Sequence, residues 1–237
     1  MQHESCSHSS SDSNRYHGVG CVSLVPIFNH LEEEQLQEVM KTVRHRSLAK
    51  HEYLYSAGDT SNSLYVVNRG KIKIFRLSES GKEQLLRILQ HGDFTGELAL
   101  FQQAEHEAYA EALTETEVCV IHRDDFQQLL MKYPTISLKV LTEFANRLDY
   151  VEKQTTLFAT EKVETRIAHY LLACLEEQQR DDGVIDLPMS KKDLASHIGT
   201  TPETVSRRLR EFEEADLIRQ EGRRRIIILR EEDLLHV

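Results

Sequence analysis

The spacing of hydrophobic residues changes midway along the chain, and this change limits the folds that the sequence can adopt. From about His51 to Phe126, short runs of β-branched and aromatic residues alternate with glycines. The runs are EYLYSAG, SLYVVNRG, KIKIFRL, LLRIL and EVCVIH, and the glycines are Gly58, Gly70, Gly81, Gly92 and Gly96. Strands at this regular spacing with turn residues between them are typical of an antiparallel sandwich, barrel or roll.

A helical period follows over residues 136–158. Its apolar residues recur at steps of three and four, with Thr155 in the remaining slot, and are Leu141, Phe144, Leu148, Val151 and Phe158. This spacing forms an a/d seam, which predicts a helix that pairs two protomers. The alternative is a helix that lies on the core of its own domain.

The C-terminal part of the chain carries signals for two short consecutive helices. Ser190 and Asp193 form an S-x-x-D start for the first helix, and Gly199 ends it. Thr201-Pro202 starts the second helix, with Thr201 as the N-cap. Two β runs turned by EGRRR follow, so the order predicts a winged helix-turn-helix.

Several polar side chains of the second helix lie off its apolar stripe of Val205, Leu209 and Phe212. Near the N-terminal end of such a helix, side chains of this kind can reach base edges in the major groove of DNA. We therefore predict a DNA-contacting set of Thr201, Glu203, Ser206, Arg207 and Arg210, with phosphate contacts from Arg208, Arg219, Arg223, Arg224 and Arg225. The alternative is that Glu203 is only the acid of a capped helix and that the arginines form a solvated face.

Because the chain is acidic overall, any contact with DNA must depend on a local basic patch. The net charge is −10 and the isoelectric point is near 5.7, so no overall positive field attracts nucleic acid or anionic lipid. No apolar run reaches the roughly 18 residues that a membrane helix needs, and the N-terminus lacks the pattern of a secretion signal. The 4 cysteines have long, unequal spacings. We expect a cytoplasmic protein without a membrane partner, whose thiols are normally reduced.

Taken together, these features resemble the Crp/Fnr family of bacterial transcription regulators. ETVSR, Glu203 to Arg207, is similar to the E-x-x-S-R signature of the Fnr branch. The resemblance implies an α+β fold: a flexible Cys/His-containing arm (1–20), a β-roll sensor like cyclic-nucleotide-binding domains (21–135), a dimerisation helix (136–159) and a winged helix-turn-helix domain (160–237). It also implies a homodimer that binds a palindrome with TTGA-like half-sites in double-stranded DNA and contacts RNA polymerase. Arg207 would read guanine, Glu203 the opposite cytosine and Ser206 a thymine.

DFTGELALF, Asp93 to Phe101, is similar to the family's phosphate-binding cassette for cyclic AMP. The family's Arg-Ser pair, which holds the cyclic phosphate, is replaced here by Glu107 and Ala108. A carboxylate repels a phosphate, and no Lys or Arg occurs from Ile88 to His122. The sequence therefore argues against cyclic AMP as the effector and leaves Gly96 and Glu97 as framework residues.

The cysteines leave the effector open. Cys119 and Cys21 match two of the four cysteines that hold an iron–sulfur cluster in the Fnr branch, but the tight C-x-x-C spacing is missing. One alternative is a reversible disulfide from Cys6 or Cys21 to Cys119, which would resemble the thiol-containing Fnr-like proteins of lactic-acid bacteria. A second is a zinc or iron–sulfur site that draws on His3, Cys6, His8, His17 and Cys21. The third is a disordered arm with Cys119 and Cys174 as buried apolar residues, in a regulator that needs no effector.

An enzyme is the competing class of function, because antiparallel rolls also host metal-dependent catalysis. Such a site needs a motif like H-x-H, and His91, Glu97, His106 and His122 lack that spacing. The chain also has no G-x-S-x-G, P-loop or G-x-G-x-x-G motif. We therefore predict a regulator without catalytic residues.

Overall fold

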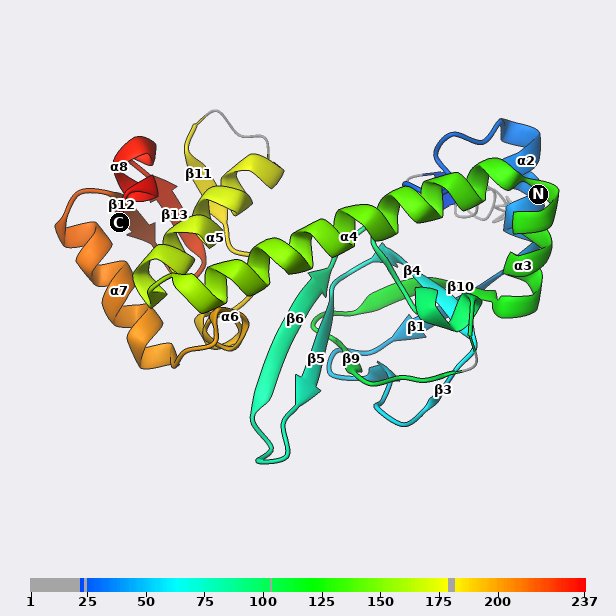
Figure 1. Ribbon diagram of the computed structural model, residues 1–237, viewed down its shortest axis with the longest axis horizontal. Helices are drawn as coiled ribbons and strands as arrows, with labels where there is room; N and C mark the ends of the chain where they lie inside the picture. Colours follow the sequence, from blue (N-terminus) through cyan, green and yellow to red (C-terminus); the bar gives the residue numbers. More distant parts are fainter. Residues whose placement is uncertain (1–21, 24, 103, 179–181) are drawn as a thin grey trace, which may run out of the picture.

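The computed structural model describes residues 22–23, 25–102, 104–178 and 182–237. A β-rich part lies beneath one length of the long helix α4 (Pro134–Thr160), and a second part gathers around the other end of that helix (Figure 1). The expected arm of residues 1–20 lies outside the described residues. No helix in the described ranges is both long enough and apolar enough to span a membrane.

The β-rich part consists of two four-stranded antiparallel sheets and a small two-stranded one. The first sheet has the order β1 (Val43–Leu48), β10 (Thr116–His122), β4 (Ser63–Arg69), β7 (Phe94–Thr95). The second has the order β2 (Tyr53–Tyr55), β9 (Tyr109–Ala112), β5 (Ile72–Leu77), β6 (Glu83–Leu89). Strands β3 (Thr60–Ser61) and β8 (Ala104–Glu105) form the small one. The predicted antiparallel β architecture is confirmed.

Helices cover the first sheet. The segment from Val25 to Leu31, α2 (Glu33–Thr42) and α3 (Arg123–Lys132) contribute to one apolar cluster with β4, β10 and the start of α4. Strand β1, which the sequence analysis did not anticipate, belongs to the same sheet. Four of its six residues are exposed, so its sequence carries no alternation of apolar residues.

Helix α4 leaves most of its predicted seam in solvent. Only Ile136 and Val140, both near its start, are fully buried, and Phe144 is half-buried against Phe101. Leu141, Leu148 and Val151 are 61%, 60% and 56% exposed, and Phe158 is 37% exposed. Beyond its first turns the helix therefore does not lie with this stripe on the core of its own chain.

The C-terminal part forms the expected winged helix-turn-helix. Its elements are α5 (Val163–Gln178), β11 (Val184–Asp186), α6 (Lys191–Ile198), α7 (Pro202–Glu214), β12 (Ile218–Glu221), β13 (Arg225–Ile228) and α8 (Glu231–Leu235). The strands pair in the order β11-β13-β12. Ser190 and Asp193 form the predicted capping box, and Gly199 ends α6 at a φ of 76°. The Thr201 hydroxyl accepts a hydrogen bond from the main-chain N–H of Thr204 at 3.2 Å, which confirms Thr201 as the N-cap of α7.

Candidate sensor cavity and nucleic-acid interface

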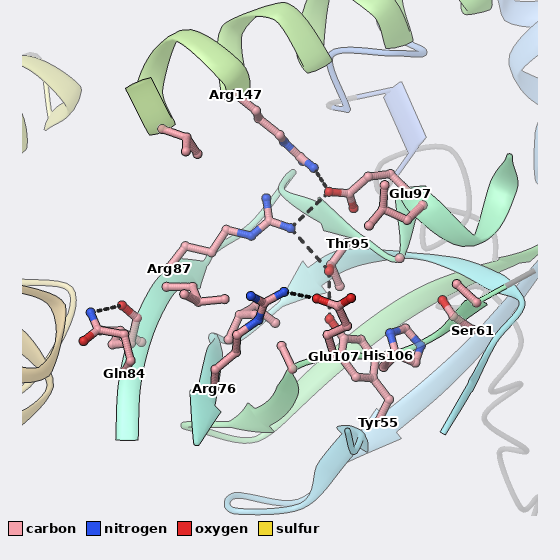
Figure 2. Close-up of a pocket in the computed structure, with 18 of the residues that line it drawn as sticks. Tyr55, Ser61, Arg76, Gln84, Arg87, Thr95, Glu97, His106, Glu107 and Arg147 are labelled. Carbon is pink, nitrogen blue, oxygen red and sulfur yellow. Dashed lines mark hydrogen bonds and ion pairs between the residues drawn. The ribbon is translucent and has the colours of Figure 1, made fainter. Parts of the chain in front are cut away.

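A cavity of about 490 Å³ lies where the β-rich part, α4 and the C-terminal part meet (Figure 2). The strands and the short 3-10 helix η1 (Glu97–Leu100) supply most of its lining. One side of α4, between Arg147 and Phe158, and His197 of α6 complete it. The cavity therefore touches all three parts of the chain.

Three guanidinium groups border the cavity, and each is paired with a carboxylate. Arg147 of α4 hydrogen-bonds Glu97, and Arg87 of β6 lies 3.4 Å from the same carboxylate (Figure 2). Arg76 of β5 pairs with Glu107. These cations could not be identified from the segment around the cassette, because the fold brings them from β5, β6 and α4. Glu107, at the position of the family's phosphate-binding arginine, instead engages an arginine of the chain itself.

An aromatic pair forms another wall of the cavity. The rings of Tyr55 and His106 stack with centroids 3.6 Å apart, and the Tyr55 hydroxyl lies 2.9 Å from the Thr95 hydroxyl. Burial raises the pKa of Tyr55 to about 12. Burial also lowers the pKa of His106, whose Nε2 atom is buried without a hydrogen-bond partner. Both groups are therefore neutral at pH 7.

Cys119 is fully buried on β10, among the residues that pack beneath the N-terminal segment. It is disulfide-bonded, and its Sγ atom lies 3.7 Å from Nδ1 of His45 on the paired strand β1. Cys174, the other described cysteine, is free and buried. The remaining members of the predicted redox and metal sets lie outside the described residues: His3, Cys6, His8, His17 and Cys21. Within the described ranges, no three or more His, Cys, Asp or Glu side chains group as a metal site.

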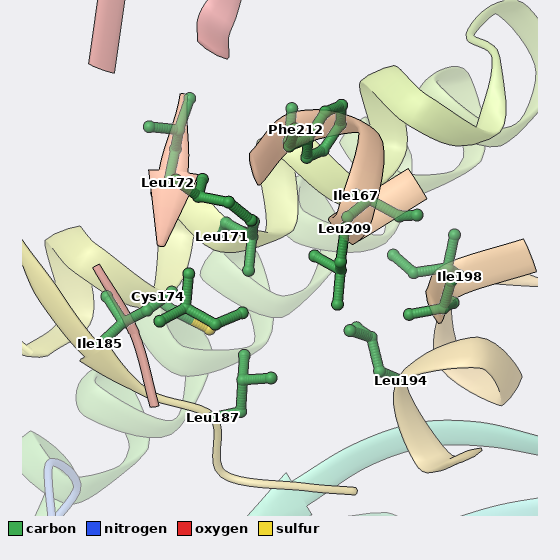
Figure 3. Close-up of a cluster of buried hydrophobic side chains, with 14 of the residues drawn as sticks. Ile167, Leu171, Leu172, Cys174, Ile185, Leu187, Leu194, Ile198, Leu209 and Phe212 are labelled. Carbon is green, nitrogen blue, oxygen red and sulfur yellow. The ribbon is translucent and has the colours of Figure 1, made fainter. Parts of the chain in front are cut away.

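The recognition face of α7 is set by what the helix buries. Leu209 and Phe212 point into a core that includes Ile167 of α5 and Leu194 of α6 (Figure 3). The stripe at Val205, Leu209 and Phe212 is buried as predicted. Because the helical period puts the apolar stripe on one side of α7, polar side chains on the other side face the solvent. The exposed ones are Glu203, Ser206, Arg207 and Arg210.

The two adjacent arginines of α7 have different surroundings. Arg207 is 64% exposed in its side chain, and its nearest carboxylate, that of Glu211, is 3.9 Å away. Arg208 is 31% exposed and lies 2.6 Å from Glu211 and 3.6 Å from Glu164 of α5. The structure therefore leaves Arg207 available for a ligand, whereas Arg208 joins α7 to α5.

The wing and the start of α7 complete the candidate interface. The turn between β12 and β13 places Gly222 at a φ of 71°, and the wing residues Arg223, Arg224 and Arg225 are exposed. Nε of Arg225 lies 3.2 Å from Asp186. Hydrogen bonds from its own main-chain N–H and from the Thr201 hydroxyl hold the pKa of Glu203 below its usual value, so this carboxylate is ionised at neutral pH.

Both the β-rich part and the C-terminal part match known protein families. Residues 45–133 match the cyclic nucleotide-binding domain, and residues 165–237 match the Crp-like helix-turn-helix domain. A probable transcriptional regulator, flp, of Lacticaseibacillus casei is 40% identical over 90% of this chain and 96% of its own length. The chain belongs to the Crp/Fnr family of DNA-binding transcription regulators.

A further relative and a solved structure are also similar to this chain. The cyclic AMP receptor protein of Thermus thermophilus is 29% identical over 82% of this chain and 88% of its own length. The solved structure of a CooA mutant from Carboxydothermus hydrogenoformans superposes with a TM-score of 0.76 over 90% of this chain and 94% of that one, at 20% identity. That likeness concerns the fold alone. The predicted family and the predicted fold are both confirmed.

Proposed function

We propose that this Crp/Fnr family member acts as a homodimer that binds a palindrome with TTGA-like half-sites and contacts RNA polymerase. The observation that carries the proposal is the single outward face of α7, on which Glu203, Ser206 and Arg207 are exposed while the opposite stripe is buried. Arg can donate two hydrogen bonds to guanine, and an ionised Glu can accept one from cytosine. Arg210 extends this face, and the exposed wing arginines would contact phosphates.

The exposed stripe of α4 supports the homodimer. Leu141, Leu148 and Val151 follow the a/d spacing and lie in solvent in the single chain. Pairing two copies of α4 along this stripe would bury it, with Phe144 and Phe158 at the same interface. Two recognition helices related by a twofold axis match a palindromic operator. In this proposal the sensor domain comprises residues 21–135, the dimerisation helix residues 136–159 and the DNA-binding domain residues 160–237. The arm of residues 1–20 takes part in control.

For regulation, we propose a reversible disulfide between Cys119 and Cys6 or Cys21. The disulfide-bonded state of Cys119 supports this choice, as does its place beneath the N-terminal segment that begins with Val22. Oxidation would tie the start of the chain to β10, and reduction would release it. Glu107, already paired with Arg76, argues against cyclic AMP in the cavity.

The DNA proposal is tested with two matched arginine variants. Arg207→Ala should abolish the preference for a TTGA palindrome over scrambled DNA, because each bidentate base contact contributes about 1–3 kcal/mol of discrimination in each half-site. Arg224→Ala should weaken both DNAs alike and make the salt dependence shallower by about one unit per protomer. Fluorescence anisotropy titrations at several salt concentrations measure both. Equal behaviour of the two variants on both DNAs would contradict the proposal.

The redox proposal is tested with Cys119→Ser, because the change removes the disulfide with little change in volume. Wild-type operator affinity should differ between dithiothreitol and diamide, whereas the affinity of Cys119→Ser should be the same in both. Metal analysis of anaerobically purified protein covers the alternative of zinc or an iron–sulfur cluster at the arm. A stoichiometric metal would replace the disulfide account, and an unchanged wild-type affinity with no metal would favour a regulator without an effector.

A further inference from the structure

Of the two residues that pair with Cys119 across its sheet, one is polar. Strand β10 lies between β1 and β4 (Figure 1), and the register places Cys119 opposite His45 on one side and Val66 on the other. Val66 is apolar and fully buried, whereas Nδ1 of His45 lies 3.7 Å from the Cys119 Sγ atom. Cross-strand partners share one face of a sheet, so the imidazole lies directly beside the sulfur.

The bonded state of Cys119 fixes the direction of this contact. A disulfide sulfur carries no hydrogen and can only accept, so the hydrogen bond must come from Nδ1–H of His45. The ring is therefore already oriented with a proton toward the sulfur atom. An imidazole can both give and take a proton near neutral pH.

The position of the pair connects a buried sulfur with the solvent. Cys119 is fully buried in an apolar cluster that includes Val39 and Phe126. His45 lies on β1, the edge strand of the sheet, and is exposed. The imidazole consequently contacts the sulfur on one side and water on the other, so a proton can pass between them through its ring.

The arginines next to His45 in the sequence cannot take its place. Successive side chains of a strand point to opposite faces, so Arg44 and Arg46 lie on the face away from Cys119. The Arg46 guanidinium donates to the main-chain carbonyl of Leu54 at 2.9 Å. Among the side chains of β1, His45 is thus the one placed to exchange a proton with this sulfur.

Burial in an apolar cluster makes a thiolate a poor leaving group. It raises the pKa of a thiol, as it does for Cys174, whose pKa is about 11. Thiol–disulfide exchange becomes slower as the pKa of the departing thiol rises. A proton delivered to the sulfur while the S–S bond breaks removes this obstacle, because the group then leaves as a neutral thiol.

We propose that His45 is the proton donor that allows Cys119 to leave when its disulfide is reduced. A thiolate of an external dithiol attacks the sulfur bonded to Cys119, because the Cys119 sulfur itself is buried. The S–S bond breaks, its electron pair passes to Cys119, and His45 protonates this sulfur and regains a proton from the solvent. The second thiol of the reductant resolves the mixed disulfide, so the dithiol loses two electrons and becomes a disulfide. This role rests on the regulatory disulfide proposed above and adds the residue that sets its rate of reduction.

The proposal is tested by the rate at which dithiothreitol reduces the oxidised full-length protein at neutral pH. Samples are quenched with iodoacetamide in urea, and mass spectrometry gives the fraction of Cys119 that is alkylated. His45→Ala should slow the reduction about tenfold or more, because the proton donor beside the leaving sulfur is lost. His45→Gln should be equally slow, since its amide donates a hydrogen bond but does not give up a proton.

Free imidazole distinguishes proton transfer from a structural effect of the substitution. In His45→Ala an exposed side chain of the edge strand is missing, so imidazole from the buffer can reach the place that the ring occupied. Added imidazole should restore much of the rate in His45→Ala and leave the wild-type rate unchanged. Ser47→Ala is the matched control, because Ser47 is exposed on the same strand but pairs with Glu117. Its rate should equal that of the wild type with and without imidazole.

The possible failures are distinguishable. Wild-type rates in both His45 variants would overturn the role of His45 and leave the regulatory disulfide standing. A slow His45→Ala that imidazole does not accelerate would also overturn this role. Alkylation of Cys119 in the oxidised wild type without any reductant would show that the disulfide itself is absent, and both proposals would then fail.

Discussion

At the scale of single residues, Arg207 and Arg208 have different expected roles although they are adjacent. Arg208→Ala should lower the free energy of unfolding by about 0.5–1 kcal/mol, because it removes the partly exposed ion pairs with Glu164 and Glu211. Its preference for the operator over scrambled DNA should stay close to that of the wild type. Urea unfolding and anisotropy titrations measure the two effects. Loss of operator preference without any loss of stability would assign Arg208 to the DNA after all.

Cys174 differs from the disulfide-bonded Cys119 in that its thiol is free. Burial raises the pKa of the Cys174 thiol to about 11, so the reactive thiolate is about 100-fold scarcer at pH 8 than for a thiol at the ordinary value. Iodoacetamide should therefore leave Cys174 unmodified in the native protein and label it in urea, as read by mass spectrometry. Rapid native labelling of Cys174 would contradict this.

The same shift has a consequence for stability. Because the folded-state pKa lies above the ordinary value of 9.0, this thiol contributes fully to stability below pH 9, and its contribution is lost as the pH rises through about 11. Cys174→Ala should make the decline in the free energy of unfolding between pH 9 and 11 shallower. The comparison is urea unfolding of both proteins at pH 8 and pH 10.5. An equal decline in the two proteins would show that the thiol does not contribute to it.

At the scale of elements, local chemistry decided which parts of the fold were predictable. The caps of α6 and α7 depend on side chains next to the helix starts, so Ser190 and Thr201 could be identified from the sequence. Strand β1 could not be identified in this way, because most of its residues are exposed and show no alternation of apolar side chains. It is a strand because it pairs with β10. The cavity arginines were missed for a related reason. Arg87 and Arg147 are 60 residues apart and meet only at Glu97, after the fold has formed.

The stripe along α4 gives a prediction at the same scale. Leu148→Glu should convert the proposed dimer to a monomer, because two carboxylates would face each other in an apolar seam. Asn146→Glu adds the same charge to an exposed position of the helix outside the stripe and should leave the dimer intact. Sedimentation velocity distinguishes the two states. A dimeric Leu148→Glu, or a wild-type monomer both with and without operator DNA, would contradict the α4 interface.

At the scale of the whole molecule, a chain with a net charge of −10 nevertheless places exposed arginines on the outward face of α7 and on the wing. In the cavity, by contrast, arginines from three elements form ion pairs with Glu97 and Glu107, which neutralise their charge. These carboxylates already occupy the guanidinium groups that an anionic ligand would need. Binding of a phosphate would require breaking at least one of these pairs and would leave a carboxylate beside the new anion.

This arrangement predicts the response of the whole protein to cyclic AMP. A ligand at 100 times its dissociation constant raises the free energy of unfolding by about 2.7 kcal/mol, which moves the melting temperature by several degrees. Millimolar cyclic AMP should leave the melting temperature of the wild type unchanged, because Glu107 repels the cyclic phosphate and holds Arg76. Glu107→Arg combined with Ala108→Ser restores the family's phosphate-binding pair and releases Arg76, so this variant should show a saturable increase. A saturable increase in the wild type would mean that the Glu107–Arg76 pair opens at little cost, and cyclic AMP would then have to be accepted as an effector despite the missing arginine.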